Sequence, residues 1–309
     1  MLTVQSITKF DEQHSTVLTI GTFDGVHVGH REILRRLTKS AAALGLKSTV
    51  LTFFPHPRMV LQKDSDIKLL NTINEKANIL GQLGIDCLIV HPFTIEFSRL
   101  TATQFVRDNL VNKLGMKKII IGYDHRFGRN RTANINDLRA FGSTLGFEVE
   151  EISAQEIDDV SVSSTKIRKA LENGDVLVAN QYLGYAYMLT GTIIKGRGLG
   201  RQIGFPTANL HIPETYKLIP KNGVYAVEAL LNGKRVHGMM NIGFNPTVAD
   251  DEQRSIEVNF FDFEADLYGQ EIQVNVLHRL RNETKFESVE ALRQQLMKDK
   301  ENAIALISK

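Results

Sequence analysis

Two histidines, His27 and His30, lie in a glycine-bearing turn, Gly21-Thr-Phe-Asp-Gly-Val-His-Val-Gly-His30, between a short β-rich run and a helical stretch. Imidazoles can donate to phosphate oxygens and to the charge that develops on them in a transition state. Backbone amides at a helix N-terminus favour phosphate, and Gly25 and Gly29 let the backbone approach a ligand closely. The Gly-Lys-Ser/Thr of a P-loop is absent. The turn therefore favours a nucleotide-phosphate site over two unrelated surface histidines.

A second set of chemistry-bearing residues lies in the glycine-rich stretch 196–210. Four glycines in nine residues give a flap that can cover phosphates with backbone amides. Thr207 and Asn209 follow, and in an extended chain they point to the same face, as two hard oxygen ligands for Mg²⁺ should. The alternative is a turn in which Pro206 and Asn209 are ordinary turn residues.

Two further positions carry polar chemistry. In Ser163-Ser-Thr-Lys-Ile-Arg168, hydroxyls at a helix start and a guanidinium one turn on can make an anion site. The alternative is an ordinary helix N-cap beside a solvated arginine. Glu257 stands on the opposite face of its predicted strand from Ile256 and Val258, and that face is either a solvent surface or the mouth of a site.

Strand and helix patterns alternate through the first part of the chain and must position these residues. Runs rich in β-formers predict strands at 17–20, 48–54, 86–90, 118–121 and 147–152. Apolar periodicity predicts helices at 31–44, 74–83, 103–114 and 136–145. This alternation predicts an α/β domain with a parallel sheet and crossover helices.

The pattern changes after Gly184. Short β-rich runs at 187–194, 223–230, 235–242, 255–261 and 271–280 are separated by turn signals such as Asn232-Gly233. They predict a compact antiparallel β-barrel, and a helical stretch at 289–307 follows. We therefore expect two domains, residues 1–184 and 185–309, which fits a chain of 309 residues.

Composition excludes several classes of function. The net charge of +2 lacks the basic excess of a domain that holds a long polyanion, so no nucleic-acid partner is expected. No apolar run approaches the roughly 20 residues of a membrane span, and the N-terminus does not resemble a secretory signal. Cys87 is the single cysteine and is interpreted as a core residue. These features predict a cytoplasmic protein without a membrane partner.

The first part resembles a known family. His27-Val-Gly-His30 matches the His-x-Gly-His motif of the nucleotidyltransferase superfamily, and the whole turn resembles prokaryotic bifunctional riboflavin kinase/FMN adenylyltransferases, also called FAD synthetases. Three segments support this: Phe54-Pro-His-Pro57, Gly122-Tyr-Asp-His-Arg-Phe-Gly128 and Ser163–Arg168. His125 departs from the aromatic residue that the family often has at that position.

The resemblance implies a site that transfers AMP from ATP to FMN. His27 and His30 would be catalytic and would hold the ATP phosphates. The remaining ATP and phosphate contacts would come from Gly21, Phe23, Asp24, Gly25, Gly29, Asp124, Ser164, Thr165 and Arg168. Flavin contacts would come from Phe54, Pro55, His56, Pro57, Arg126 and Phe127. For Phe54 and Phe127, core packing remains the alternative.

The second part closely resembles the riboflavin kinase signature, in Gly196–Leu210 and again in Asn241-Ile-Gly-Phe-Asn-Pro-Thr247 and Glu257–Phe263. The resemblance implies that Thr207 and Asn209 bind Mg²⁺–ATP and that Glu257 is the base that takes the proton of the ribityl hydroxyl. ATP contacts would also come from Gly196, Gly198, Gly200, Arg201, Gly204 and Pro206. Asn259 stands where many relatives have histidine.

The implied enzyme phosphorylates riboflavin to FMN and adenylylates FMN to FAD, releasing ADP and pyrophosphate. Mg²⁺ would accompany ATP as co-substrate, and no permanently bound prosthetic group is expected. The sequence leaves homo-oligomerisation open. Two rival hypotheses stay open: an enzyme in which one of the two domains is active, and a flavin-binding sensor or structural module without turnover.

Overall fold

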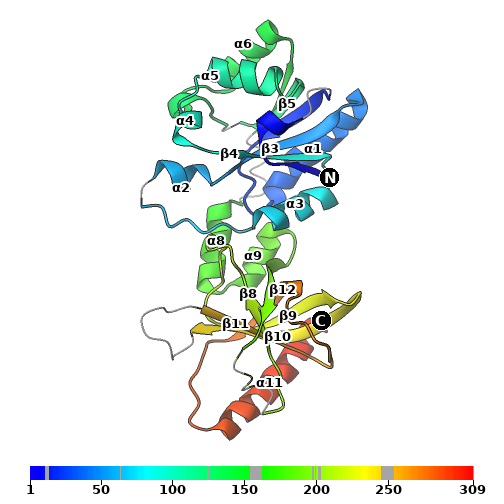
Figure 1. The fold of residues 1–309 in the computed structure, drawn as a ribbon, viewed down its shortest axis with the longest axis vertical. Coiled ribbons are helices and arrows are strands. Elements are labelled where there is room, and N and C mark those ends of the chain that lie inside the picture. The colour runs from blue at the N-terminus through cyan, green and yellow to red at the C-terminus, as the bar shows by residue number, and fades with distance from the viewer. Residues whose placement is uncertain are drawn as a thin grey trace. The chain divides into compact units, whose positions relative to one another are not determined.

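The computed structural model describes residues 1–10, 14–62, 64–123, 125–153, 162–196, 198, 200, 203–244 and 254–308. It divides into two compact units, Met1–Ser163 and Ser164–Lys309 (Figure 1). Two of the predicted site residues, Asp124 and Arg201, lie outside the described residues.

The first unit is built on a six-stranded sheet in which every pairing is parallel. Its order is β1-β4-β3-β2-β5-β6. The strands are β1 (Leu2–Val4), β2 (Thr16–Ile20), β3 (Lys47–Phe54), β4 (Cys87–Pro92), β5 (Met116–Gly122) and β6 (Glu148–Ile152). The parallel α/β prediction is confirmed. The sequence missed β1, because three residues carry too little pattern to register as a strand.

Helices bury both faces of this sheet. The helices are α1 (Val28–Leu44), α2 (Pro57–Leu61), α3 (Ile73–Gln82), α4 (Ile95–Ser98), α5 (Ala102–Gln104) and α6 (Ile135–Leu145). Helix α1 turns Leu34, Leu37 and Ala41 inward and ends at Gly45, which adopts the left-handed conformation with φ 65°. The predicted helix 103–114 is instead the short α5 followed by a π-helical segment, Phe105–Val111.

The strand order explains where a ligand can bind in the first unit. Sheet order places β3 on one side of β2 and β5 on the other, so the connections leaving β2 and β5 diverge at this point. In open parallel sheets, ligands bind at such a switch point, outside the carboxyl ends of the strands. The turns after β2, β3 and β5 all leave from this edge, and they carry the predicted residues.

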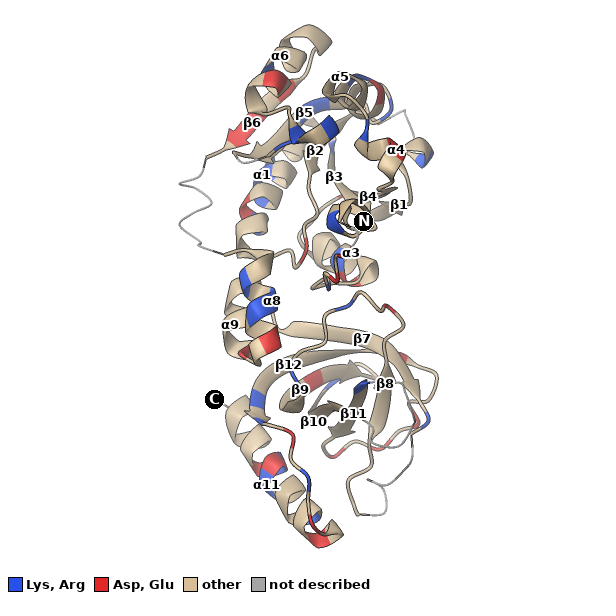
Figure 2. Cartoon of the chain, turned by 90° about the vertical axis from the view of Figure 1, so that its left-hand side faces the viewer, with Lys and Arg blue, Asp and Glu red and all other residues tan. Residues whose placement is uncertain are grey.

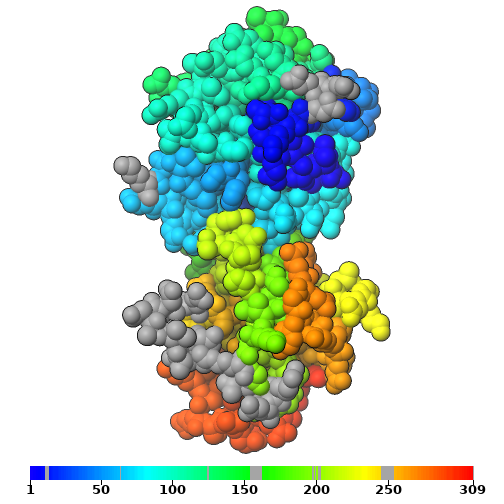
Figure 3. Space-filling view, viewed as in Figure 1, coloured from blue at the N-terminus to red at the C-terminus, as the bar shows by residue number. Residues whose placement is uncertain are grey.

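The second unit is a closed antiparallel barrel of order β10-β11-β8-β7-β12-β9. Its strands are β7 (Tyr187–Ile194), β8 (Ala208–His211), β9 (Gly223–Leu231), β10 (Lys234–Phe244), β11 (Arg254–Phe260) and β12 (Glu271–Arg281). Asn232 and Gly233 have φ of 50° and 75°, so they form the predicted tight turn between β9 and β10. That turn, in yellow, projects from the barrel in Figure 3. The barrel prediction is confirmed.

The helices described in the barrel unit include α8 (Ser164–Asn173), α9 (Val176–Leu183) and α11 (Val289–Ile307). Figure 2 shows α11 along one side of the barrel, where Ala303 packs in a cluster with Val224, Met239 and Phe261. No described helix combines the length and apolarity needed to cross a membrane.

Helices α8 and α9 belong structurally to the barrel unit. The Asn180 side chain donates from Nδ2 to the Val276 carbonyl over 2.9 Å and accepts from the Tyr187 amide over 2.7 Å. The Lys221 amide donates to the Leu171 carbonyl over 3.0 Å. The compact units therefore divide between Ser163 and Ser164, and the expected functional boundary at residue 184 stays a prediction.

Candidate functional site

The turn after β2 packs tightly at the carboxyl end of that strand. Phe23, Asp24 and Val26 are at most 3% exposed. Phe23 and Val26 adopt left-handed backbone with φ of 43° and 36°, which residues other than glycine seldom do. Gly25 has φ of 85°, which glycine adopts at no steric cost. Surrounding contacts must hold this backbone, as is common at ligand sites.

His27 and His30 form one stacked pair at the start of α1. Their ring centroids lie 3.6 Å apart, and the ring planes make an angle of 18°. The Phe23 and His30 rings pack edge to face, with their centroids 5.1 Å apart. His27 is the residue that precedes α1, and its side chain makes no capping hydrogen bond. Nδ1 of each histidine is buried without a hydrogen-bond partner among the described residues. A buried polar atom without a partner is the kind of group that a bound ligand satisfies.

Both histidines are neutral at pH 7. Burial lowers the pKa of His27 to about 4, although the charge of Asp24 works in the opposite direction. Burial, His27 and Lys76 together hold the pKa of His30 well below its usual range. Neutral imidazoles donate one hydrogen bond each, so the pair offers directed donors to an anion rather than two positive charges.

A segment that the sequence analysis did not single out supports this turn. Oδ1 of Asp24 accepts the Leu70 amide over 2.9 Å. Nζ of Lys76 donates to the Thr22 carbonyl over 2.7 Å, and Lys76 is 3% exposed. The signal in the sequence was the capping box of Thr72 and Glu75, which starts α3. No pattern indicated that the lysine after it would be buried.

The turn after β3 leaves from the same edge of the sheet. Phe54 ends β3 and is half-buried, while Pro55 is exposed. Nδ1 of His56 accepts the Arg58 amide over 3.1 Å, so His56 caps α2, and Pro57 opens that helix. The described contacts of His56 thus include a structural one.

The turn after β5 separates its two predicted flavin contacts. Arg126 is exposed. Phe127 is 7% exposed and packs in the core of the first unit, with the Phe105 ring centroid 6.4 Å away. Phe127 therefore has the burial that the core-packing alternative requires.

The predicted anion motif does lie at a helix start. Ser164, Thr165 and Arg168 occupy the first turns of α8, where Thr165 is exposed and the other two are half-buried. Because α8 belongs to the second compact unit, the three residues lie in the same unit as the barrel.

In the barrel, Thr207 and Glu257 form a polar cluster. The hydroxyl of Thr207 donates to Oε2 of Glu257 over 3.2 Å. Glu257 pairs with Asn209 across β8 and β11, and with Asn241 across β10 and β11. The hydrogen bond and the strand pairing thus bring a hydroxyl, two amides and a carboxylate together, and Glu257 is half-buried. The assignment of this face as the mouth of a site stays a prediction. Asn241 beside Glu257 was not predicted as a site residue.

Two of the glycines beside this cluster have little room for a side chain. A Cβ on Gly196 would lie 2.1 Å from Nδ2 of Asn209, and one on Gly200 would lie 2.2 Å from the Phe205 carbonyl oxygen. Asn259 donates from Nδ2 to the Pro206 carbonyl over 2.7 Å, which holds the chain that leads to Thr207. Gly198 and Gly204 have φ of 72° and 82°.

The donor set of this cluster fits Mg²⁺. Thr207, Asn209 and Glu257 offer hydroxyl, amide and carboxylate oxygens, the hard ligands that Mg²⁺ takes alongside substrate phosphates. Among the described residues, no group of three or more His, Cys, Asp or Glu side chains could hold a metal ion.

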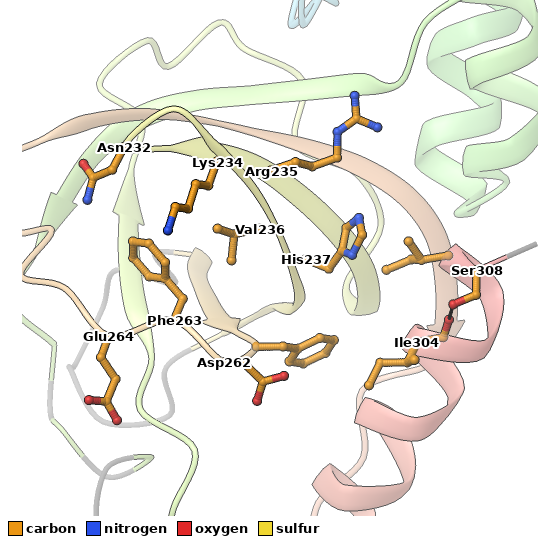
Figure 4. Close-up of a pocket in the computed structure, with 12 residues that line it drawn as sticks. Asn232, Lys234, Arg235, Val236, His237, Asp262, Phe263, Glu264, Ile304 and Ser308 are labelled. Carbon is orange, nitrogen blue, oxygen red and sulfur yellow. Dashed lines mark hydrogen bonds between the residues drawn. The ribbon is translucent and has the colours of Figure 1, made fainter.

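A cavity of about 680 Å³ lies elsewhere in the barrel unit. Figure 4 shows it between the β9–β10 turn, the segment after β11 and the last turn of α11. Lys234 and His237 line one side, Asp262 and Glu264 another, and Ile304 the third. None of the residues predicted for the barrel site lines it. The polar cluster, rather than this hollow, marks the candidate site.

Comparisons with known proteins agree with the family resemblance of both parts of the chain. A family model for FAD synthetase matches residues 9–166, and one for riboflavin kinase matches residues 183–307. The chain is 40% identical to a bifunctional riboflavin kinase/FMN adenylyltransferase of Listeria monocytogenes, over 95% of this chain and 93% of the relative. A protein of the same description from Bacillus subtilis is 39% identical, over 96% and 94%.

One solved structure is similar over almost the whole chain. A crystal structure described as a macrolide-efflux protein from Streptococcus pneumoniae has a TM-score of 0.87 and 31% identity, and the match covers 98% of each chain.

Proposed function

The chain belongs to the bifunctional riboflavin kinase/FMN adenylyltransferase family, and we propose on this premise that it makes FAD from riboflavin in two ATP-dependent steps. The barrel phosphorylates riboflavin to FMN, and the nucleotidyltransferase domain adenylylates FMN to FAD. One observation supports this most strongly: each half carries its own buried or half-buried polar cluster, one around His27 and His30 and one around Thr207 and Glu257.

In the kinase step, Glu257 accepts the proton of the ribityl 5′-hydroxyl. The hydroxyl oxygen then bonds to the γ-phosphorus of ATP, and the bond to ADP breaks. Thr207 and Asn209 would hold Mg²⁺, and the ion when bound would supply positive charge beside the ATP phosphates. The further ATP contacts of this step come from Gly196, Gly198, Gly200, Arg201, Gly204 and Pro206. The hydrogen bond from Thr207 to Glu257 supports placing base and phosphate ligand side by side.

In the adenylyl step, a phosphate oxygen of FMN bonds to the α-phosphorus of ATP, and pyrophosphate leaves. The FMN phosphate is already an anion, so this step needs positioning and charge neutralisation rather than a base. His27 and His30 donate to the phosphates, and the buried Nδ1 atoms support this role. The nucleotide site is shaped by Gly21, Phe23, Asp24, Gly25, Gly29 and Asp124. Its second anion motif comes from Ser164, Thr165 and Arg168.

Flavin contacts in the adenylyl step come from Phe54, Pro55, His56, Pro57, Arg126 and Phe127. We assign residues 1–184 to this step and 185–309 to the kinase step, so α8 and α9 serve the first activity while they pack in the second unit. The protein works in the cytoplasm on small molecules, without a nucleic acid or membrane partner.

The test is incubation of the full chain with riboflavin, ATP and Mg²⁺, followed by chromatographic separation of the flavins. FMN should appear first and FAD after it. FMN without FAD would refute the bifunctional assignment, and no product at all would favour a flavin-binding module.

A further inference from the structure

Lys76 is a buried lysine to which the mechanism above gives no role. It lies in the first turn of α3 and is 3% exposed. Its Nζ donates to the Thr22 carbonyl over 2.7 Å, and Thr52 donates to the same oxygen over 3.2 Å. Burial of an ammonium group is costly unless nearby groups compensate for the lost water. A charge kept at this position therefore calls for an explanation beyond packing.

Two hydrogen bonds show which part of the turn after β2 is fixed by the segment that contains Lys76. The Thr22 carbonyl immediately precedes Phe23, the first of the left-handed residues of the turn. At the other end of the same segment, the Leu70 amide donates to Asp24 over 2.9 Å. The stretch from Leu70 to Lys76 thus fixes the turn at two points, Thr22 and Asp24, on either side of the strained Phe23.

Electrostatics give Lys76 a second role. His27 and His30 are neutral at pH 7, because burial lowers the pKa of each. Burial also lowers the pKa of Lys76, to about 8, although the charge of Asp24 raises it. Glu75, next to Lys76 on the same helix, instead turns its carboxylate to the Thr72 amide. Lys76 is therefore protonated at pH 7 beside two uncharged imidazoles.

We propose that Lys76 is a positioning residue of the adenylyltransferase site: it fixes the turn at Thr22 for phosphate binding and supplies the positive charge that the neutral histidines lack. This inference rests on the proposed function. The ligand it favours is the polyphosphate of ATP, and pyrophosphate as it leaves. A bound polyphosphate compensates the buried ammonium in turn, because opposite charges stabilise each other in a poorly hydrated site.

The first test is Lys76→Met, which keeps the length and apolar stem of the side chain and removes its charge. At pH 7, kcat/KM for ATP in FAD formation from supplied FMN should fall about tenfold to a hundredfold, the range for a hydrogen bond to a charged group. FMN formation from riboflavin, which occurs in the other unit of the same chain, should not change. The matched control is Lys118→Met. This change removes an ion pair of 2.8 Å with Glu150 near the start of β5, at the end of the strand away from the proposed site. The rates of FMN formation and of FAD formation should both stay at wild-type values.

The pH profile separates a charge from a structural support. In the wild type, adenylylation should decline as the pH rises through about 8, because Lys76 loses its proton. Lys76→Met should lack this decline, and the two proteins should converge toward about pH 10. Asp24→Asn should move the decline to lower pH, because the Asp24 charge favours protonated Lys76. That variant also carries the test if Lys76→Met does not fold.

The outcomes are distinct. Wild-type rates in Lys76→Met, an unchanged alkaline decline in that variant, or an unshifted decline in Asp24→Asn would each overturn the role of Lys76. Failure of the wild type to make FAD from FMN would overturn the adenylyl step and this inference with it.

Discussion

Thr207 and Glu257 share a hydrogen bond of 3.2 Å that links the residue before β8 to β11. The bond places a proposed phosphate ligand and the proposed base in one cluster, although they lie fifty residues apart in the chain. Because the two groups touch, a change at either one should affect the kinase step and spare the adenylyl step.

Glu257→Gln should slow FMN formation by about a hundredfold to ten-thousandfold, the usual range for loss of a general base. The amide keeps an oxygen that Thr207 can donate to, so the barrel should remain folded. Conversion of supplied FMN to FAD should continue at the wild-type rate. Glu271→Gln, at the exposed start of β12, is the control and should affect neither step. Riboflavin phosphorylation at an undiminished rate in Glu257→Gln would show that the base lies elsewhere.

His30→Ala should act on the other step. It removes the ring that stacks on His27 at 3.6 Å and one donor to the phosphates, so FAD formation from FMN should fall about a hundredfold. FMN formation should be unchanged, and so should both rates in His14→Ala, at an exposed position before β2. Equal loss of both steps in His30→Ala would point to general misfolding, and undiminished FAD formation would remove His30 from the site.

Stability should fall with pH on the acid side of neutrality. Burial lowers the pKa of His27 and of His91 from 6.5 to about 4, so between these values the unfolded chain binds protons that the folded chain does not. The stabilisation is complete above pH 6.5 and is lost as the pH falls toward 4. The slope of the free energy of unfolding against pH measures how many more protons the unfolded chain binds. His91→Gln should lower this number by up to about one, as measured by urea unfolding across that pH range. A variant that keeps the full wild-type slope would contradict the assignment.

Asp299 should be important for the stability of the barrel unit. It is 1% exposed and accepts Nε and Nη2 of Arg281 as well as Nε2 of Gln295, with its shortest contacts at 2.8 Å. Asp299→Ala leaves the partly buried Arg281 without its partner, and the free energy of unfolding should fall by about 2 to 4 kcal/mol. Lys300→Ala, which breaks a surface ion pair with Asp262, should cost less than about 1 kcal/mol. Similar costs for both would show that the Arg281–Asp299 pair contributes little.

Local sequence patterns predicted most of the fold for a physical reason. Strands such as 187–194 and 271–280 are long enough for β-branched residues to register, and Asn232-Gly233 has the backbone freedom that its turn requires. The strands β1 and β8 are three and four residues long and escape such patterns. The assignment of α8 and α9 to the barrel unit rests on long-range contacts such as Asn180 to Val276, which local periodicity does not encode.

Some residues of the candidate site could likewise be predicted from local sequence, and others could not. The residue types of His27, His30, Thr207 and Glu257 pointed to their chemistry, because histidines beside glycines and clustered oxygen donors are unusual in plain turns. Lys76 gave no such signal, since its role depends on burial beside Thr22 and Asp24, 54 and 52 residues earlier in the chain. Arg126 and Phe127 are neighbours in sequence, but the structure exposes one and buries the other.

The central claim is that two separate sites in one chain perform the two steps, and a mixing experiment tests it most directly. Glu257→Gln and His30→Ala are each incubated with riboflavin, ATP and Mg²⁺, first apart and then together, and the flavins are separated by chromatography. Apart, Glu257→Gln should leave riboflavin largely unconverted and His30→Ala should stop at FMN. Together they should make FAD, because FMN released by one variant is adenylylated by the other. A mixture that accumulates FMN without FAD would contradict two independent sites.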